Sequence, residues 1–322
     1  MATTQRIILG DCIAGMKTLE ACSINCCVTS PPYWGLRDYG HDGQIGLEET
    51  PEAYVARMVD VFREVRRVLR DDGTLWLNLG DSYARTGGWA SNDGLDGCKR
   101  GESGRAKTNC NNGSGQKCPA TLKEKDLVGI PWRVAFALQA DGWWLRQDII
   151  WHKPNPMPES VTDRCTKAHE YVFLLTKSER YFYDPEAIKE QAKSSSEGIR
   201  FGRNKYGEDE SAFHATKSGN VSKEYKKANK RSVWTVSTKP YSGAHFAVMP
   251  PDLVDPCIKA GCPEGGTVLD PFAGSGTTLA VAAGLGRNAI GCELNQNYIK
   301  LAESRIAEAR QSVALFEAFS AE

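Results

Sequence analysis

The stretch TSPPYW, residues 29–34, places a hydroxyl and two large aromatic rings at a rigid corner of the chain. Two consecutive prolines fix two φ angles and remove two backbone donors, and the residue before a proline is pushed towards extended geometry. The preceding residues 24–28, INCCV, are typical of a short buried strand. We therefore expect Ser30 and Tyr33 to be held stiffly at a strand end. A rigid turn that merely packs would also explain these six residues taken alone.

The stretch DPFAGSGTT, residues 270–278, is a second group of residues that could bind a ligand. A strand, VLD, leads into this Gly-rich turn, and a helix, TTLAVAAGLG, follows it. Glycines let backbone N–H groups approach a ligand, and the N-terminus of a helix favours negative groups. The turn lacks the lysine that follows the last glycine of a P-loop, which excludes that class of site.

Glu293 ends the next predicted strand, 288–292. An acid at the end of the second strand of such a unit binds ribose hydroxyls. The turn and this acid together indicate an adenosine-containing cofactor. NAD is the obvious rival, but DPFAGSGTT does not match the spacing of GxGxxG.

Strands and helices that could position these residues alternate along most of the chain. Thr50, Pro51 and Glu52 predict a helix start, with an N-cap residue, a proline at the first position and an early acid. Apolar residues then follow helical spacing, and Asp72-Gly73 is expected to end this helix. Further helices are expected at 127–141, 277–285 and 298–313, and strands at 6–10, 24–29, 74–79, 144–151, 170–176, 267–270 and 288–292. This alternation predicts an α/β fold with a parallel or mixed sheet.

Two irregular stretches, 85–120 and 190–240, interrupt the alternation, and each overlaps a basic segment. Residues 98–125 carry a net charge of +5 and residues 187–240 a net charge of +6, although the whole chain is neutral with 40 basic and 40 acidic residues. The remainder therefore carries −11. Two basic segments on an acidic body are typical of a local polyanion-binding surface, and solvated loops explain the charges equally well.

The composition of the 322 residues is ordinary for a globular protein. No apolar run approaches membrane-spanning length and the N-terminus lacks the pattern of a signal peptide, so we expect a cytoplasmic protein without membrane contact. The 11 cysteines are then expected to be reduced thiols. Cys98, Cys110 and Cys118 could form a zinc site, but their spacings fit no usual knuckle, and no metal is expected.

DPFAGSGTT followed by Glu293, with SPPY at a separate strand end, resembles the amino-methylating DNA methyltransferases that use S-adenosylmethionine. The SPPY corner comes first and the cofactor turn last, which is similar to the permuted β class of these enzymes. The resemblance covers most of the chain outside the two irregular stretches. It implies a Rossmann-like methyltransferase sheet with helices on both faces, plus a small inserted target-recognition region. The implied division is a catalytic core over 1–189 and 241–322, with target recognition at 190–240.

The resemblance also implies the chemistry of the corner. An exocyclic amine on a base is a poor nucleophile, because its lone pair is delocalised into the ring. Ser30 Oγ and the Pro31 carbonyl would accept its two N–H groups, held in place by Pro31 and Pro32. Tyr33 would stack on the target base, which must leave the duplex to be reached. SPPY is often associated with cytosine N4, but serine occurs with both targets, and the family as a whole favours adenine N6 slightly.

The cofactor contacts carry over in the same way. Asp270 would lie by the methionine amine, Glu293 on the ribose and Asp11 at the adenine amino group, although Asp11 could instead be a helix N-cap. Phe246 lies in a segment that resembles the one closing over the methionine end. The full set of expected cofactor residues is Asp11, Cys12, Phe246, Asp270, Phe272, Ala273, Gly274, Gly276, Thr277, Thr278 and Glu293.

The expected macromolecular partner is double-stranded DNA, bound by a homodimer because one subunit of this size covers little more than a half-site. The phosphate contacts are expected from the basic segments, at Lys99, Arg100, Arg105, Lys107, Arg203 and Lys205. Three alternatives stay open. The release-factor glutamine methyltransferases also have a PPY corner, but with Asn before it and with the opposite motif order. An RNA methyltransferase and a non-catalytic DNA-binding relative are the other two.

Overall fold

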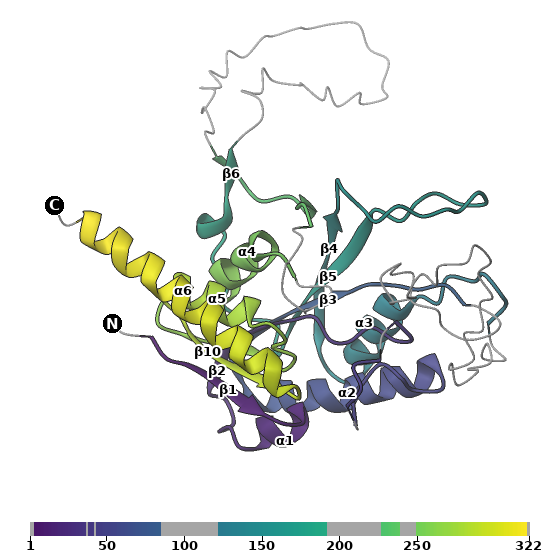
Figure 1. Ribbon diagram of the computed structural model, residues 1–322, viewed down its shortest axis with the longest axis horizontal. Helices are drawn as coiled ribbons and strands as arrows, with labels where there is room; N and C mark the ends of the chain where they lie inside the picture. The colour runs from purple at the N-terminus through teal and green to yellow at the C-terminus, as the bar shows by residue number, and fades with distance from the viewer. Residues whose placement is uncertain are drawn as a thin grey trace, which may run out of the picture.

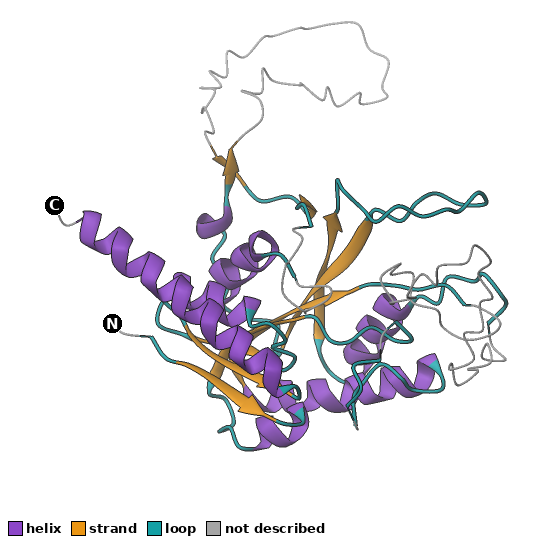
Figure 2. Cartoon of the chain, viewed as in Figure 1, coloured by secondary structure: helices purple, strands orange, loops and turns teal. Residues whose placement is uncertain are grey.

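The computed structural model describes residues 3–36, 38–41, 43–84, 122–191, 227–238 and 249–320, with side chains up to residue 312. Its centre is an eight-stranded sheet, drawn in orange in Figure 2. In spatial order the strands are β1 (Gln5–Leu9), β10 (Asn288–Glu293), β9 (Thr267–Asp270), β2 (Ile24–Thr29), β3 (Leu69–Leu79), β5 (His169–Thr176), β4 (Trp144–His152) and β8 (Val233–Thr235). A separate two-stranded ladder joins β6 (Glu190–Gln191) to β7 (Lys227–Ala228).

The first five strands of the sheet are parallel, and β5 is antiparallel to both of its neighbours. From β2 the chain crosses over to β3, whereas from neighbouring β9 it crosses over in the opposite direction to β10. The strand order therefore reverses between β2 and β9. Ligands of open α/β sheets bind outside the carboxyl ends of the strands at such a switch point.

In the described part of the chain, helices cover both faces of the sheet (Figure 1). One layer contains α1 (Cys12–Lys17), α2 (Pro51–Val68) and α3 (Ile130–Ala140). The other contains α4 (Pro251–Gly261), α5 (Thr277–Gly284) and α6 (Gln296–Ser320), with the short 3-10 helix η1 (Glu186–Ile188) beside α4. This arrangement confirms the predicted Rossmann-like class.

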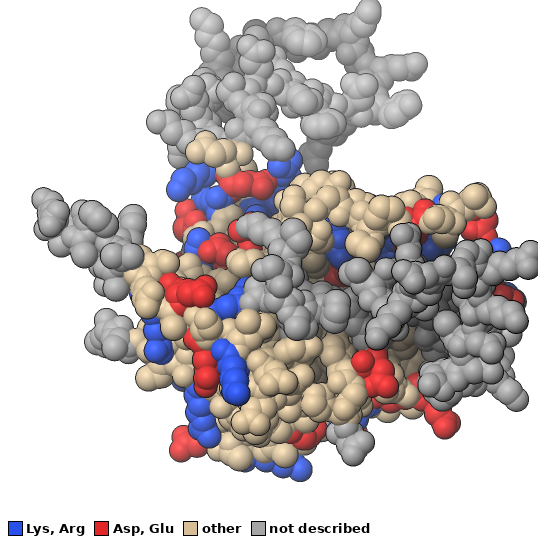
Figure 3. All heavy atoms as spheres, in the orientation of Figure 1, with Lys and Arg blue, Asp and Glu red and all other residues tan. Residues whose placement is uncertain are grey.

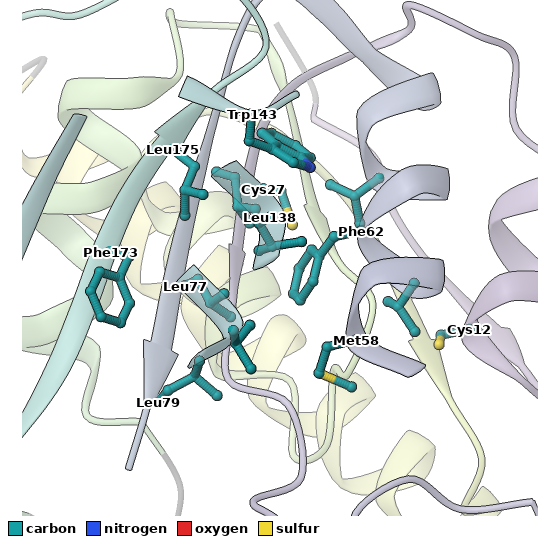
Figure 4. Packing of buried hydrophobic residues seen from close by; sticks show 14 of the residues in the cluster. Cys12, Cys27, Met58, Phe62, Leu77, Leu79, Leu138, Trp143, Phe173 and Leu175 are labelled. Atoms are coloured by element: carbon teal, nitrogen blue, oxygen red, sulfur yellow. The ribbon is translucent and has the colours of Figure 1, made fainter. Parts of the chain in front are cut away.

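The apolar side chains of the inner strands alternate between the two layers, as a sheet buried on both faces requires. In β3, Leu75 and Leu77 pack into the layer of α1 to α3, while Trp76 packs into the opposite layer. Figure 4 shows Met58 and Phe62 of α2 facing this first layer of strand residues. Close packing against α2 thereby fixes the position of the inner strands, at whose ends the two predicted motifs lie.

The second helix ends earlier than the sequence indicated. Thr50 caps it as expected, accepting a hydrogen bond from the Ala53 N–H at 3.1 Å. The helix stops at Val68 instead of at Asp72-Gly73, and β3 begins at Leu69, so the prediction of both boundaries was wrong. The last carbonyls of the helix accept hydrogen bonds from the backbone just before β2, at 2.9 and 3.1 Å, and Leu69 pairs with Ile24 in the sheet. Strand pairing overrides the local helical pattern here.

Two helices were missed altogether. Helix α1 is only six residues long and contains a glycine. Helix α4 begins at Pro251, directly after Pro250, and contains Pro256 in its interior, and these prolines hid its pattern. Pro251 is tolerated because a missing N–H in the first turn would be unpaired in any case.

The β8 strand shows how one end of the stretch 190–240 is held. It pairs in parallel with β4 at the edge of the main sheet. Trp234 is 5% exposed, and its ring lies 6.3 Å from the ring of Trp76. This aromatic residue of the basic stretch therefore packs into the core of the main sheet.

Eight cysteines of the described residues are free thiols. Within the same residues no helix is long and apolar enough to cross a membrane. On the face drawn in Figure 3, Lys and Arg side chains of the described residues are interspersed with Asp and Glu. The basic segment 98–125 lies outside the described residues except for its last four positions.

Candidate active site at the strand switch point

The carboxyl ends of the parallel strands bring the two predicted motifs into one pocket. Ser30 follows β2, Asp270 ends the neighbouring β9, and Glu293 ends β10. Asp11 follows β1 at the same edge. All four line a single pocket at the switch point. Thr29, next to Ser30, is hydrogen-bonded to Asp270 across a separation of 241 positions in the sequence.

The Gly-rich turn is shaped by two glycines with positive φ, Gly274 at +50° and Gly276 at +76°. Glu293 holds the turn from the next strand. Its Oε2 accepts the Gly274 N–H at 2.8 Å, and its Oε1 accepts the Asn295 N–H at 2.8 Å. Burial raises the pKa of the Glu293 carboxyl, and these backbone hydrogen bonds act in the opposite direction. Each oxygen has a second lone pair with which it could accept a ligand hydroxyl.

Gly276 lies in the turn but faces away from the pocket. A Cβ at this position would come within 2.5 Å of the Ala302 Cβ on α6. From the same helix Arg305 donates to the Ser275 side chain at 2.7 Å and to the Thr277 hydroxyl at 2.9 Å. Helix α6 therefore packs against the outer side of the turn and holds it through Arg305. The sequence did not indicate this contact.

Asp270 lines the pocket and is only 3% exposed. Its Oδ1 accepts hydrogen bonds from the Thr29 hydroxyl at 2.7 Å and from the Phe272 N–H at 3.1 Å. Burial raises the pKa of this carboxyl to about 6, and these hydrogen bonds limit the rise. A cation bound beside Asp270 would recover part of the desolvation cost by favouring the carboxylate form.

Asp11 is placed for both of the roles considered for it. Its Oδ1 accepts the Ala14 N–H at 2.9 Å and caps α1, while its Oδ2 lies 3.6 Å from the Arg57 guanidinium. The residue also lines the pocket, next to Cys12. The N-cap and the ligand-facing position are thus compatible.

The SPPY corner is fixed by contacts to its prolines as well as by their rings. Tyr54 of α2 is fully buried and donates its hydroxyl to the Pro32 carbonyl at 2.8 Å. Among the described residues, none donates a hydrogen bond to the Pro31 carbonyl. Pro31 lines the pocket beside Ser30, so the two acceptors expected there belong to one rigid loop.

Tyr33 is anchored through its hydroxyl. The hydroxyl donates to Glu170 Oε2 at 2.7 Å and lies 3.1 Å from Asn78 Oδ1, and Ser30 Oγ lies 3.4 Å away. Burial and the nearby Glu170 carboxylate raise the pKa of the Tyr33 phenol well above its usual value. The ring lies against Gly80, where a Cβ would come within 2.5 Å of Cε2. Tyr33 also lines the pocket.

Most of the predicted cofactor residues line this pocket. The exceptions are Gly276, which faces α6, and Phe246, which lies outside the described residues. Also outside them are the predicted phosphate contacts and the three cysteines considered for zinc. These are Lys99, Arg100, Arg105, Lys107, Arg203, Lys205, Cys98, Cys110 and Cys118. The residues that the structure does describe contain no cluster of His, Cys, Asp or Glu that could hold a metal ion.

The sequence did not indicate two further segments that line the pocket. Tyr39, His41 and Gln44 come from the segment that follows the SPPY corner, and Asn295 and Tyr298 from the segment after β10. The glycines of GHDGQIG, residues 40–46, were the available signal, because Gly40, Gly43 and Gly46 all have positive φ. The residues that contact the Tyr33 hydroxyl, Asn78 and Glu170, could not be recognised from the sequence around them.

An open sheet with this strand order, an acid at the ends of two neighbouring strands and a Gly-rich turn between them define a Rossmann-like enzyme that binds a nucleoside-containing cofactor. A rigid serine-containing corner on the adjoining strand is what distinguishes this pocket within that class.

The DNA methylase family model for N6 and N4 methyltransferases matches residues 24–304, and the chain belongs to this family. It is 47% identical to the type II methyltransferase M.SmaI of Serratia marcescens over 306 residues, which cover 95% of this chain and 91% of that protein. It is 46% identical to the type II methyltransferase M.Cfr9I of Citrobacter freundii, over 92% of this chain and 86% of that protein. The protein is therefore a type II DNA methyltransferase of the amino-methylating family.

Two solved structures agree with the fold. The cytosine-N4-specific PvuII DNA methyltransferase is 17% identical with a TM-score of 0.62, and the match covers 97% of this chain and 93% of that one. The DNA modification methylase TTHA0409 of Thermus thermophilus, solved in complex with S-adenosyl-L-methionine, is 24% identical with a TM-score of 0.57, covering 95% and 94%. Both similarities support the fold of the chain.

Proposed function

We propose that this protein transfers a methyl group from S-adenosylmethionine to an exocyclic amino group of a base in duplex DNA, with Ser30 as the hydrogen-bond acceptor at the reacting amine. One observation carries the proposal. Ser30 at the end of β2 faces the same pocket as Asp270 and Glu293 at the ends of β9 and β10. A nucleophile bound at Ser30 and a cofactor bound at the two acids would therefore share one site.

The pocket fits S-adenosylmethionine in the charge and placement of its hydrogen-bond acceptors. Asp270 offers a buried carboxylate to the methionine ammonium group, and Glu293 offers two oxygens to the ribose hydroxyls. Phe272 and Cys12 supply apolar surface, and Gly274 has no side chain to obstruct the turn. When bound, the cofactor supplies an electrophilic methyl group on a sulfonium.

The chain's own contribution to the reaction is orientation and hydrogen bonding. The amine must turn its nitrogen lone pair out of conjugation before it can attack. Ser30 Oγ and the Pro31 carbonyl accept its two N–H groups and favour that geometry, and the two prolines keep both acceptors in place without reorganisation. The Tyr33 ring forms a wall against which the base would stack.

The target amine is cytosine N4 in our proposal, with adenine N6 as the alternative. Both amines have two N–H groups, so the acceptor pair suits either. The slight preference for adenine came from the family as a whole, and no described residue supports it. The serine of the SPPY corner is a property of this chain, and such corners are often associated with cytosine N4. The target base would be flipped out of the duplex to reach this pocket.

The basic segments would hold the duplex while the base is displaced. Their net charges of +5 over 98–125 and +6 over 187–240 suit phosphate contacts. We propose that 190–240 also carries base readout, and that a homodimer covers the full site.

The test is a transfer assay with S-adenosylmethionine labelled in its methyl group. Duplex DNA, RNA and total protein are offered in parallel, and DNA is then digested to nucleosides that are identified by mass. Label on DNA as N4-methylcytosine is the expected result, and N6-methyladenine would support the alternative amine. Label on RNA or protein, or on no substrate across varied DNA sequences, would contradict the proposal.

A further inference from the structure

A chain of hydroxyl groups connects the reacting corner to a carboxylate on the far side of Tyr33. Ser30 Oγ lies 3.4 Å from Tyr33 Oη, and Tyr33 Oη lies 2.7 Å from Glu170 Oε2. The other carboxylate oxygen of Glu170 is paired with the Lys153 ammonium group. Four strands meet here, because the corner follows β2, Asn78 lies on β3, Lys153 follows β4 and Glu170 lies on β5 (Figure 1).

The direction of these hydrogen bonds follows from the number of protons available. Glu170 Oε2 and Asn78 Oδ1 can both only accept, and the carboxylate oxygen is the charged and nearer of the two, at 2.7 Å against 3.1 Å, so Tyr33 donates its single proton to Glu170. Its oxygen can then accept from Ser30, whose own proton is directed at Tyr33 Oη. The raised pKa of Tyr33 keeps the phenol protonated and able to donate. The lone pairs of Ser30 Oγ are thereby left for the amine of the substrate.

The carboxylate itself is held in one orientation. The Asn78 amide is 2% exposed and donates to Glu170 Oε2 at 3.2 Å and to the Tyr171 carbonyl at 3.0 Å. Lys153 also lies 4.3 Å from the centre of the Trp151 ring. The side chains of Lys153 and Glu170 are only 19% and 15% exposed. Desolvation offsets much of the attraction in such a pair, so stability alone is a weak explanation for it.

No other carboxylate among the described residues is hydrogen-bonded to a hydroxyl of Ser30 or Tyr33. Asp270 is bonded to Thr29 and to the Phe272 backbone, and Asp11 to the Ala14 backbone and Arg57. Within this part of the chain, Glu170 alone connects the corner to a group that is partly exposed to solvent.

We propose that Ser30, Tyr33 and Glu170 form a relay that orients the Ser30 hydroxyl and carries away the proton released by the methylated amine. The inference rests on the proposed function. As the nitrogen–methyl bond forms and the sulfur–methyl bond breaks, the sulfonium becomes a neutral thioether and the amine nitrogen becomes cationic. Its surplus proton passes to Ser30 Oγ, the serine proton to Tyr33 Oη, and the tyrosine proton to Glu170 Oε2. Glu170 ends as a neutral acid, and the product amine is neutral. Glu170 acts through Tyr33 and Ser30 and is a positioning residue in this scheme, whereas the Tyr33 ring also contacts the base.

Tyr33→Phe and Glu170→Gln interrupt the relay with little change in shape. We expect each to lower the single-turnover methylation rate by roughly a hundredfold, at the low end for assisted proton transfer. The affinity for S-adenosylmethionine and the KM for duplex DNA should stay within about twofold of wild type, because the substrate contacts are retained. The double variant should lose no more than the worse single variant, since both changes interrupt one chain.

Tyr171→Phe is the matched control. It removes a hydroxyl from the neighbouring residue on β5, whose ring stacks on Phe173, and should leave the rate unchanged. Glu170→Gln leaves the Lys153 charge without its partner, so if that variant does not fold, Tyr33→Phe alone decides the matter. Wild-type rates in Tyr33→Phe, or additive losses in the double variant, would overturn the relay. Wild-type protein that methylates no DNA would instead overturn the proposed function, and the two failures are thus distinguishable.

Discussion

The buried carboxylate of Asp270 predicts a pH dependence of cofactor binding. Burial raises its pKa from 3.8 to about 6, with the Thr29 and Phe272 hydrogen bonds limiting the rise. A methionine ammonium group beside it would favour the charged form and lower the pKa in the complex. Binding of S-adenosylmethionine must then expel a proton wherever the free carboxyl is protonated.

The size of the effect follows from that titration. At about pH 5 a carboxyl with a pKa of about 6 is roughly nine-tenths protonated, so the affinity should be about tenfold weaker than at about pH 7.5. Above about pH 7 the affinity should be nearly independent of pH for this group. Glu293 also has a raised pKa and titrates in the same direction, so a variant of Asp270 is needed to separate the two.

Asp270→Asn removes the charge but keeps an oxygen for Thr29 and Phe272. It should weaken cofactor binding by roughly ten- to a hundredfold at neutral pH, the range for losing a charge-assisted hydrogen bond. It should also flatten the dependence of affinity on pH that Asp270 contributes.

The same substitution should stabilise the free protein. Because the folded-state pKa of Asp270 lies above its unfolded value, its contribution to stability is fully present below pH 3.8 and is lost as the pH rises through about 6. The difference between 3.8 and about 6 corresponds to about 3 kcal/mol of lost stability at neutral pH, and Asp270→Asn should recover about 1–3 kcal/mol of it.

Calorimetric titration with S-adenosylmethionine between about pH 5 and 8, together with urea unfolding without cofactor, measures both effects. Asp184→Asn is the control, because Asp184 Oδ1 accepts the N–H groups of Glu186 and Ala187 and the Asn side chain keeps an oxygen for both, so neither quantity should change. Equal wild-type affinities at both ends of the pH range would refute the reasoning. So would an Asp270→Asn variant that binds the cofactor like wild type.

Three further predictions follow from the same structure. Glu293→Ala should weaken S-adenosylmethionine binding at least about tenfold with little change in DNA affinity, and unchanged cofactor affinity by calorimetry would show that another acid binds the ribose. Gly276→Ala should lower the free energy of unfolding by about 2–4 kcal/mol, because it combines a positive φ with a Cβ 2.5 Å from the Ala302 Cβ, and a wild-type urea midpoint would contradict this. Replacing Lys99, Arg100, Arg105 and Lys107 by Ala should weaken binding to all DNA duplexes equally and reduce the dependence of binding on salt concentration. An unchanged salt dependence would mean that the phosphate contacts lie elsewhere.

Residues whose roles depend on local pattern were predictable from the sequence. The strands that present both motifs have the expected bounds, because β2 and β9 are short apolar runs that end in turn-forming residues. Thr50 and Pro51 likewise marked the start of α2. The end of that helix was not predictable, since pairing between Leu69 and Ile24 competes with the helical pattern and wins.

The partners of the SPPY corner depend on contacts across the fold. Glu170 accepts a hydrogen bond from Tyr33 although the two residues are 137 positions apart in the sequence. Nothing near either residue in the sequence predicts this contact. Arg305 reaches the cofactor turn from α6 in the same way. Such residues become visible only when the sheet brings the strands together, because side-chain identity at one position carries no information on which distant strand will be its neighbour.

The most direct test of the central claim is the Ser30→Ala variant, measured for methyl transfer to duplex DNA in single turnover and for S-adenosylmethionine affinity by calorimetry. Ser30 lines the pocket beside Tyr33, whereas Asp270 and Glu293 are held by other residues, so the variant should bind the cofactor within about twofold of wild type. Its methyl transfer should fall by roughly two to three orders of magnitude, the scale for removing one preorganised polar group. Near-normal transfer by Ser30→Ala would contradict the account, because the amine would then react without the acceptor that the SPPY corner holds in place.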